Sequence, residues 1–203
     1  MLFRSMRDAV VHSTREFMDY LNKLRTEMPN RPLLVQEFLP GTEVSVGLIG
    51  NPGTSLRALP ILEVDYSGLE AELPRILGYE SKWIPDSAYW RQIAYRNTTL
   101  ELAQQRSLVD WSTALFERLH CRDYARFDFR ADAKGNMKFL EANPNPGWCW
   151  DGKFNLMAGF DGLSYADLLR LIMEAAKERL SLTGAAASER GRFTGARRLA
   201  DHG

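Results

Sequence analysis

The chain has 203 residues, of which 45% are hydrophobic, so it is long enough to bury the core of one domain. Its 26 Lys and Arg residues balance its 26 Asp and Glu residues, which argues against binding to nucleic acid or to an anionic membrane. No apolar run approaches the roughly 18 residues of a membrane span, and the N-terminus lacks a signal-peptide pattern. The two cysteines, Cys121 and Cys149, make no disulfide or metal framework, so we expect a cytoplasmic protein.

The first half of the chain is expected to begin with a helix. Ser13 and Glu16 have the spacing of a capping box, and Pro29-Asn30 ends the helical pattern. Pro60 and the Pro40-Gly41 turn interrupt the apolar segments that follow. Three strands are predicted there, at residues 33–39, 43–50 and 56–65. Residues 66–93 are rich in Gly and Pro and read as loop.

The second half contains helices on both sides of a β-hairpin. Thr98 and Glu101 form a second capping-box pattern before a long helix, and Ser164 and Asp167 form a third before the last one. A hairpin is predicted at 123–142 and a short helix at 154–160. Ala, Gly, Ser and Arg dominate the end of the chain, so residues 183–203 are expected to be disordered.

The hairpin places polar residues on one face of its first strand. Arg126, Asp128 and Arg130 alternate with apolar residues, which is typical of a half-buried strand. If Lys134 and Gly135 are the two central turn residues, Asp128 faces Glu141 on the second strand and Arg126 faces Asn143. A bulge would shift these pairs by one residue.

Two acids facing each other across a sheet repel, so something must relieve the repulsion. One carboxyl could be protonated, Arg126 and Arg130 could neutralise the pair, or a divalent cation could bind between the acids. Mg²⁺ prefers hard oxygen ligands, and such oxygens are offered by Asp128, Glu141 and the Asn143 amide. The structural alternative is a solvated outer face on which the acids pair with Arg residues. The following Pro residues stop the strand, and Gly147 lets the backbone approach a ligand closely.

The order of several motifs resembles the C-terminal part of the ATP-grasp ligases, and within them the D-alanine–D-alanine ligase family. These motifs are VQEFLPGTEVSVGLIG, YESKW, ARFDFRAD, FLEANPNPG and LSYADLLRLIMEAA. The resemblance covers about residues 32–180. It implies an α+β fold, a C-terminal ATP-grasp subdomain with an antiparallel sheet flanked by helices. The expected organisation is an N-terminal helical segment at 1–31, this subdomain at 32–182 and a tail at 183–203.

The resemblance also implies an activity. Members of the family are ATP-dependent carboxylate–amine ligases: ATP phosphorylates a carboxylate, and an amine attacks the acyl phosphate. Mg-ATP lies between two subdomains, with Mn²⁺ as the alternative ion. The implied partners are small amino acids or peptides, with no nucleic acid or membrane partner, and a homodimer is compatible with the family.

Site residues follow from the resemblance position by position. Three match the magnesium ligands: Asp128, Glu141 and Asn143. Arg126 matches the arginine that holds the transferred phosphoryl group, and Gly147 matches a glycine whose N–H points at the developing oxyanion. The residues that match nucleotide contacts are Gln36, Glu37, Phe38 and Leu39 along the adenine, Leu140 under it, Glu43 at the ribose and Lys82 at the phosphates.

Each assignment also has a purely structural alternative. Glu43 could be a solvated residue at the start of a strand, Lys82 could be a surface lysine, and the apolar residues could belong to the core. The segment after Gly147 departs from the family, and its Trp148, Trp150, Asp151 and Lys153 would form a different pocket for the second substrate. The family's N-terminal substrate domain and first ATP-grasp subdomain have no counterpart in this sequence. We therefore expect the chain alone to bind Mg-ATP weakly and to ligate slowly or not at all. The alternatives are a ligase for another amino acid or peptide, and a truncated, non-catalytic nucleotide-binding remnant.

Overall fold

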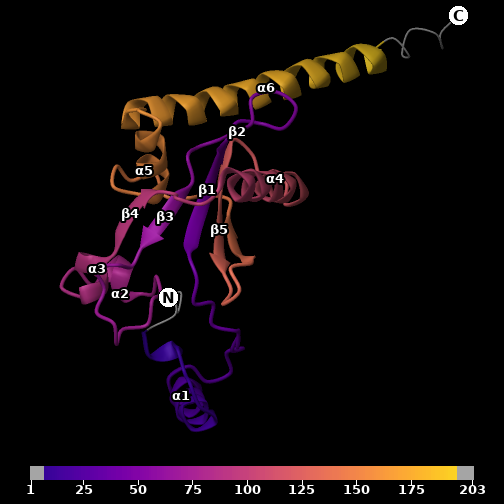
Figure 1. Ribbon diagram of the computed structural model, residues 1–203. Coiled ribbons are helices and arrows are strands. Elements are labelled where there is room, and N and C mark those ends of the chain that lie inside the picture. Colours follow the sequence, from indigo (N-terminus) through magenta and orange to yellow (C-terminus); the bar gives the residue numbers. More distant parts are fainter. Residues whose placement is uncertain (1–6, 196–203) are drawn as a thin grey trace, which may run out of the picture. The chain divides into compact units, whose positions relative to one another are not determined.

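The computed structural model describes the backbone of residues 7–195 and the side-chain environment of residues 8–181. Within these residues the chain forms a sheet with the strand order β4-β3-β1-β5-β6, and β2 pairs with β1 (Figure 1). The strands are β1 (Glu43–Ile49), β2 (Arg57–Ala58), β3 (Leu62–Asp65), β4 (Ala94–Asn97), β5 (Tyr124–Ala131) and β6 (Met137–Asn143). The helices are η1 (Arg7–Ala9), α1 (Thr14–Glu27), α2 (Glu80–Trp83), α3 (Ala88–Gln92), α4 (Leu102–Arg118), α5 (Lys153–Phe160) and α6 (Tyr165–Gly195).

The described chain divides into two compact units that are interleaved along the sequence. The first contains the described residues up to Glu43 together with Glu63–Arg96 and Arg130–Lys138. The second contains Val44–Leu62, Asn97–Phe129 and the described residues from Phe139 onward.

The second unit holds a dense apolar core around β1 and β5. Phe116 of α4 and Phe127 of β5 have no exposed surface. All residues of β1 are buried, including the polar Ser45, so this strand is covered on both faces. At Gly47 an added Cβ would lie 2.8 Å from the sulfur of Met157, so the missing side chain lets α5 lie directly against β1.

Two of the three predicted N-caps are confirmed, although in α1 the Glu16 carboxylate accepts the His12 N–H at 2.8 Å in place of the Ser13 N–H of a full capping box. The Ser13 hydroxyl accepts the Glu16 N–H at 3.2 Å in α1, and Ser164 accepts the Asp167 N–H at 3.2 Å in α6. The prediction at Thr98 is wrong, because α4 begins at Leu102 and its N-cap makes no side-chain hydrogen bond. The Thr98 N–H instead donates to the Ile61 carbonyl at 2.9 Å, which ties this residue to the chain before β3.

Several predicted elements differ from the structure. Residues 33–39 are extended without strand pairing, and Leu34 and Val35 are exposed, because β-propensity alone forms no strand without a partner. The stretch 66–93 contains the short helices α2 and α3, and Ser87 caps α3 by accepting the Trp90 N–H. Helix α6 continues to Gly195, although disorder was expected from residue 183; the rest of that predicted tail lies outside the described residues.

The hairpin of β5 and β6 is confirmed, but its turn is one residue longer than predicted. The Asp132 N–H donates to Asn136 O at 2.9 Å, and the Gly135 N–H donates to Asp132 O at 3.0 Å. Gly135 has φ +83°, and the Asp132 carboxylate accepts the backbone N–H groups of Lys134 and Asn136. The pairs beside the turn are therefore shifted by one residue from the predicted register, as a bulge would shift them.

A contact farther along the hairpin agrees with this shift. The rings of Phe129 and Phe139 meet edge to face with centroids 5.6 Å apart, so these two residues lie on the same side of the hairpin. The predicted two-residue turn is therefore wrong, but the expected closeness of the two acids is kept, because Glu141 Oε1 lies 4.0 Å from the same Arg126 Nη2 that binds Asp128.

The close approach of Gly41 to the end of β5 gives a stability prediction. An added Cβ there would lie 2.6 Å from Ala131 Cβ and 2.8 Å from the Ala131 carbonyl oxygen. We expect Gly41→Ala to lower the free energy of unfolding by about 1–3 kcal/mol, because backbone must shift to admit the methyl group. Urea unfolding followed by circular dichroism measures this change.

Gly159 is the matched control, because nothing lies within 4 Å of an added Cβ at this position in α5. Gly159→Ala should raise the free energy of unfolding by about 0.5–1 kcal/mol, since it removes a flexible residue from a helix. An unchanged unfolding midpoint for Gly41→Ala would contradict the predicted clash.

Candidate functional site

The carboxylate of Asp128 is buried in the second unit and held by donors from two strands. Only 5% of the residue is exposed. Arg126 donates from Nε to Oδ1 at 2.9 Å and from Nη2 to Oδ2 at 2.8 Å, which makes a two-point ion pair. The hydroxyl of Ser45 in β1 donates to Oδ1 at 2.6 Å. The solvated outer face that the sequence left open is thus excluded for Asp128.

A second cation approaches the same carboxylate from the start of α5. Lys153 is the first residue of that helix, and its Nζ donates to the Ser45 hydroxyl at 3.4 Å. Burial by itself would raise the pKa of Asp128, but the charge of Lys153 and the hydrogen bonds and charge of Arg126 together lower this pKa to about 2. Asp128 is therefore ionised at neutral pH, and the protonated alternative is excluded for it.

Glu141 approaches the same guanidinium from the second strand of the hairpin. Its Oε1 lies 4.0 Å from Arg126 Nη2, and 63% of its side chain is exposed. Arg126 thus relieves the repulsion between the two acids, as one of the sequence alternatives proposed. Arg130 does not take part, because it pairs elsewhere.

Asn143 completes the predicted metal set at the end of β6. It is half-buried, and its side-chain oxygen accepts the Asn145 N–H at 3.2 Å. Asp128 and Glu141 both approach Arg126, and their carboxylate oxygens and the Asn143 amide oxygen are of the kind that Mg²⁺ takes together with water or phosphate ligands. Within the described residues, no group of three or more His, Cys, Asp or Glu side chains could hold a metal, so the amide and non-protein oxygens would have to complete this site.

The loop after β6 is held by two tyrosines that the sequence reasoning missed. The hydroxyl of Tyr124 donates to the Asn145 side chain, and the hydroxyl of Tyr165 donates to the Trp148 carbonyl. The rings of Tyr124 and Trp148 also meet with centroids 5.6 Å apart. An added Cβ at Gly147 would meet only the Cys149 sulfur, at 3.6 Å, so one side of this backbone is open.

The first unit contains a second buried charge pair. Glu43 is 6% exposed, and its Oε2 accepts the Tyr66 hydroxyl at 2.7 Å and Arg130 Nη1 at 3.0 Å. Burial, followed by the neighbouring Glu43 charge, raises the pKa of Tyr66 above its usual value, so the tyrosine remains a donor. The alternative of a solvated strand start is excluded for Glu43.

The other predicted nucleotide residues divide between the two units. Gln36 and Glu37 are exposed in the extended segment before β1, Leu39 beside them is half-buried, and Lys82 is half-buried in α2. Leu140 belongs to the second unit and is exposed on β6, so it is not a core residue. Glu43 is therefore held in a buried cluster with Tyr66 and Arg130. The side chains of Gln36, Glu37 and Leu140 remain exposed to solvent.

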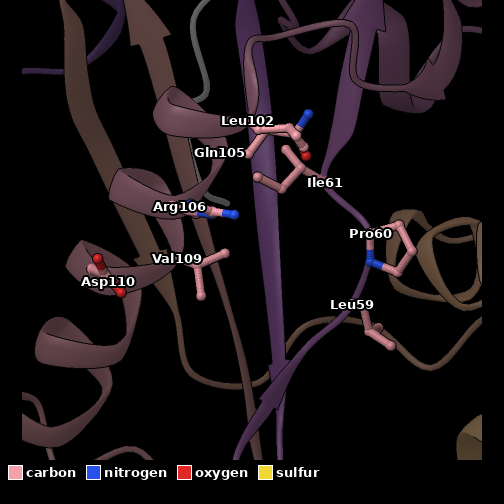
Figure 2. A pocket seen from close by; sticks show the side chains of 8 residues that line it. All are labelled: Leu59, Pro60, Ile61, Leu102, Gln105, Arg106, Val109 and Asp110. Atoms are coloured by element: carbon pink, nitrogen blue, oxygen red, sulfur yellow. The ribbon is translucent and has the colours of Figure 1, made fainter.

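A separate hollow of about 290 Å³ lies between α4 and the chain that joins β2 to β3 (Figure 2). Leu59, Pro60 and Ile61 line it on one side, and side chains of α4 line the other. The α4 residues are Leu102, Gln105, Arg106, Val109 and Asp110. None of the predicted site residues lines this hollow.

Comparison with solved structures establishes the class of fold. A D-alanine–D-alanine ligase from Bacillus anthracis, complexed with ATP, superposes with a TM-score of 0.61 at 19% identity, covering 83% of this chain and 48% of that one. The enzyme from Coxiella burnetii superposes with a TM-score of 0.64 at 18% identity, covering 92% of this chain and 45% of that one. The predicted α+β fold, an antiparallel sheet flanked by helices as in the ATP-grasp ligases, is confirmed.

The family model described as D-ala D-ala ligase C-terminus matches residues 5–174, so the chain belongs to this family. The uncharacterized protein y4sG of Sinorhizobium fredii is 31% identical over 174 residues, covering 84% of this chain and 48% of that protein. The D-alanine–D-alanine ligase of Carboxydothermus hydrogenoformans is 30% identical over 145 residues, covering 71% and 43%. The chain thus spans less than half the length of these relatives.

No helix in its described part is long and apolar enough to cross a membrane.

The ionised Asp128 gives a pH prediction. Its folded-state pKa of about 2 lies below the ordinary value of 3.8, so its contribution to stability is complete above pH 4 and is lost as the pH falls toward 2. We expect a loss on the order of 2 kcal/mol across that interval. Carbon-13 NMR titration of the Asp128 carboxyl group, together with urea unfolding at each pH, measures both quantities.

Asp86 provides the control, because 98% of its side chain is exposed. Asp86→Asn makes the same change of charge at an exposed position, and Asp128→Asn should flatten the slope of stability against pH more than Asp86→Asn does. An Asp128 titration midpoint at or above the ordinary value would overturn the account of its environment.

Proposed function

We propose that this chain is the part of an ATP-dependent carboxylate–amine ligase that supplies the metal ligands, the phosphoryl-binding arginine and part of the nucleotide contacts. In this reaction the γ-phosphoryl group of ATP passes to a carboxylate oxygen, and an amine then attacks the acyl phosphate and releases phosphate. One observation carries the proposal: an ionised, buried Asp128 is gripped by Arg126, whose guanidinium also lies near the exposed Glu141. Membership of the ligase family agrees with it.

The metal set of this proposal consists of Asp128, Glu141 and Asn143. Their carboxylate and amide oxygens suit Mg²⁺ or Mn²⁺. A bound Mg²⁺ would neutralise phosphate charge and orient the γ-phosphoryl group. Arg126 would hold the transferred group from the protein side, since its guanidinium is fixed in place by Asp128. The Gly147 N–H would donate to the oxyanion that forms when the amine attacks.

The nucleotide contacts of this proposal lie partly in the first unit. Gln36, Glu37, Phe38 and Leu39 would follow the adenine, Glu43 would bind the ribose and Lys82 the phosphates. The Phe38 side chain is 40% exposed, so it offers an apolar surface to a base. In the second unit, Leu140 offers another. The Bacillus anthracis ligase that superposes on this chain was solved complexed with ATP, which supports a nucleotide as the ligand.

The second substrate is proposed to be a small amino acid or a peptide, and the protein is proposed to act in the cytoplasm without nucleic acid or membrane partners. The exposed Trp148 and Trp150 and the charged Asp151 and Lys153 favour an amine donor other than D-alanine. A remnant that binds nucleotide without turnover is the remaining candidate. The chain spans less than half of its relatives, which supports weak activity on its own.

Calorimetry with ADP in the presence of Mg²⁺ tests the metal site. We expect Asp128→Asn and Glu141→Gln each to weaken magnesium-dependent binding by about tenfold or more, because each removes a charged ligand. Glu117→Gln, at an exposed position of α4, is the matched control and should bind as the parent chain does. Equal affinities for all four proteins, with and without EDTA, would contradict the metal assignment.

Turnover is tested separately with radiolabelled ATP and a panel of amino acids and dipeptides. We expect the isolated chain to release ADP slowly, because positioning and charge enclosure supply most of the acceleration in phosphoryl transfer. Rapid ADP formation that depends on an amino acid would show that this chain is a complete catalyst. The Arg126→Met variant is the control for a contaminating ATPase, since only activity of this protein should fall with it.

A further inference from the structure

The pair of Glu43 and Arg130 is unusual because both residues lie almost fully inside the first unit. They are 6% and 5% exposed, and the ion pair measures 3.0 Å. Burying two charges costs desolvation energy that their attraction only partly returns, so apolar residues of the same size would often be at least as stable. A buried pair of this kind calls for a role beyond holding the fold.

The two terminal nitrogens of the Arg130 guanidinium donate to two different partners, and two aromatic rings lie close to the group. Nη1 donates to Glu43 Oε2, and Nη2 donates to the backbone carbonyl of Arg75. The guanidinium carbon lies 5.3 Å from the ring centre of Phe38 and 5.5 Å from that of Tyr66. Nε is buried and has no hydrogen-bond partner among the described residues. The orientation of the group is thus fixed by contacts on four sides.

These contacts leave the two carboxylate oxygens of Glu43 in different states: Oε2 accepts hydrogen bonds from the protein, and Oε1 accepts none within the described residues. Oε2 accepts both the Tyr66 hydroxyl and Arg130 Nη1. Oε1 accepts no hydrogen bond from any group in the described part of the chain, although an ionised carboxylate oxygen has two lone pairs. A ligand that brings hydroxyl donors would satisfy this oxygen, whereas a ligand with only acceptors would be repelled.

The same guanidinium backs the ring of Phe38, whose side chain remains 40% exposed. Arg130 therefore touches both a residue proposed to lie along the base and the residue proposed to bind the sugar. Arg130 therefore sets the position of Phe38 relative to Glu43 within the first unit.

We propose that Arg130 is a positioning residue for nucleoside recognition: it fixes the Glu43 carboxylate so that Oε1 accepts a ribose hydroxyl, and so favours ribonucleotides over dideoxynucleotides. This inference rests on the proposed function, because it takes the ligand to be a nucleotide. Lysine cannot replace Arg130 fully, since a single ammonium group cannot reach Glu43 and the Arg75 carbonyl in the same fixed plane.

NMR titration of the full chain, with ADP and with 2′,3′-dideoxy-ADP in Mg²⁺, tests the proposal and measures dissociation constants into the millimolar range. The parent chain should prefer ADP by about tenfold, the effect expected of one hydrogen bond to a charged acceptor. Arg130→Met should reduce that preference below about twofold, while its affinity for dideoxy-ADP falls much less than its affinity for ADP, because dideoxy-ADP has no ribose hydroxyl to donate to Glu43. Arg130→Lys should keep an intermediate preference.

Arg118→Met, at an exposed position of α4, is the matched control and should keep the full preference. If Arg130→Met fails to fold, Tyr66→Phe removes only the second donor to the same Oε2 and should lower the preference in the same direction. The proposal is overturned if a folded Arg130→Met variant keeps the full preference for ADP over dideoxy-ADP. If Arg130→Met does not fold, the same result for Tyr66→Phe overturns it. A parent chain that binds both nucleotides equally overturns it but leaves the proposed function in place. A parent chain that binds neither nucleotide overturns both.

Discussion

The burial of an ionised carboxylate on β5 is the constraint on which the candidate site depends. A charge of this kind is stable inside a protein only when donors surround it. Asp128 obtains them from Arg126 on its own strand and from Ser45 on β1, and Lys153 adds its charge. Each of these residues must therefore be held in place by its strand or helix, which gives the site its rigidity.

The same physical rule applies two residues before Ser45 on β1, at Glu43, and two residues after Asp128 on β5, at Arg130. β1 is buried over its whole length, so its polar residues need partners within the protein. Ser45 finds Asp128, and Glu43 finds Arg130 and Tyr66. A buried strand with alternating polar side chains is costly for stability, and it is typical of a strand that serves a ligand.

Sequence reasoning identified the hairpin, the acids and their arginine because period-two alternation and local turn residues are short-range signals. It placed the turn one residue short, since the Asp132 side chain stabilises a longer turn by accepting nearby N–H groups. The contacts of Ser45, Lys153 and Tyr66 join distant segments, so no local pattern could reveal them. The alternation of Glu43 and Ser45 along one strand was the one signal available.

The place of Lys153 in the chain has a consequence for how substrate choice could change during evolution. Lys153 comes just after the stretch that follows Gly147 and is the first residue of α5, a position where the helix dipole disfavours a cation. Insertions or deletions in that stretch would withdraw its positive charge from Asp128. If this stretch binds the amine as proposed, side-chain exchanges at constant loop length would preserve the charge beside Asp128, whereas changes of loop length would remove it.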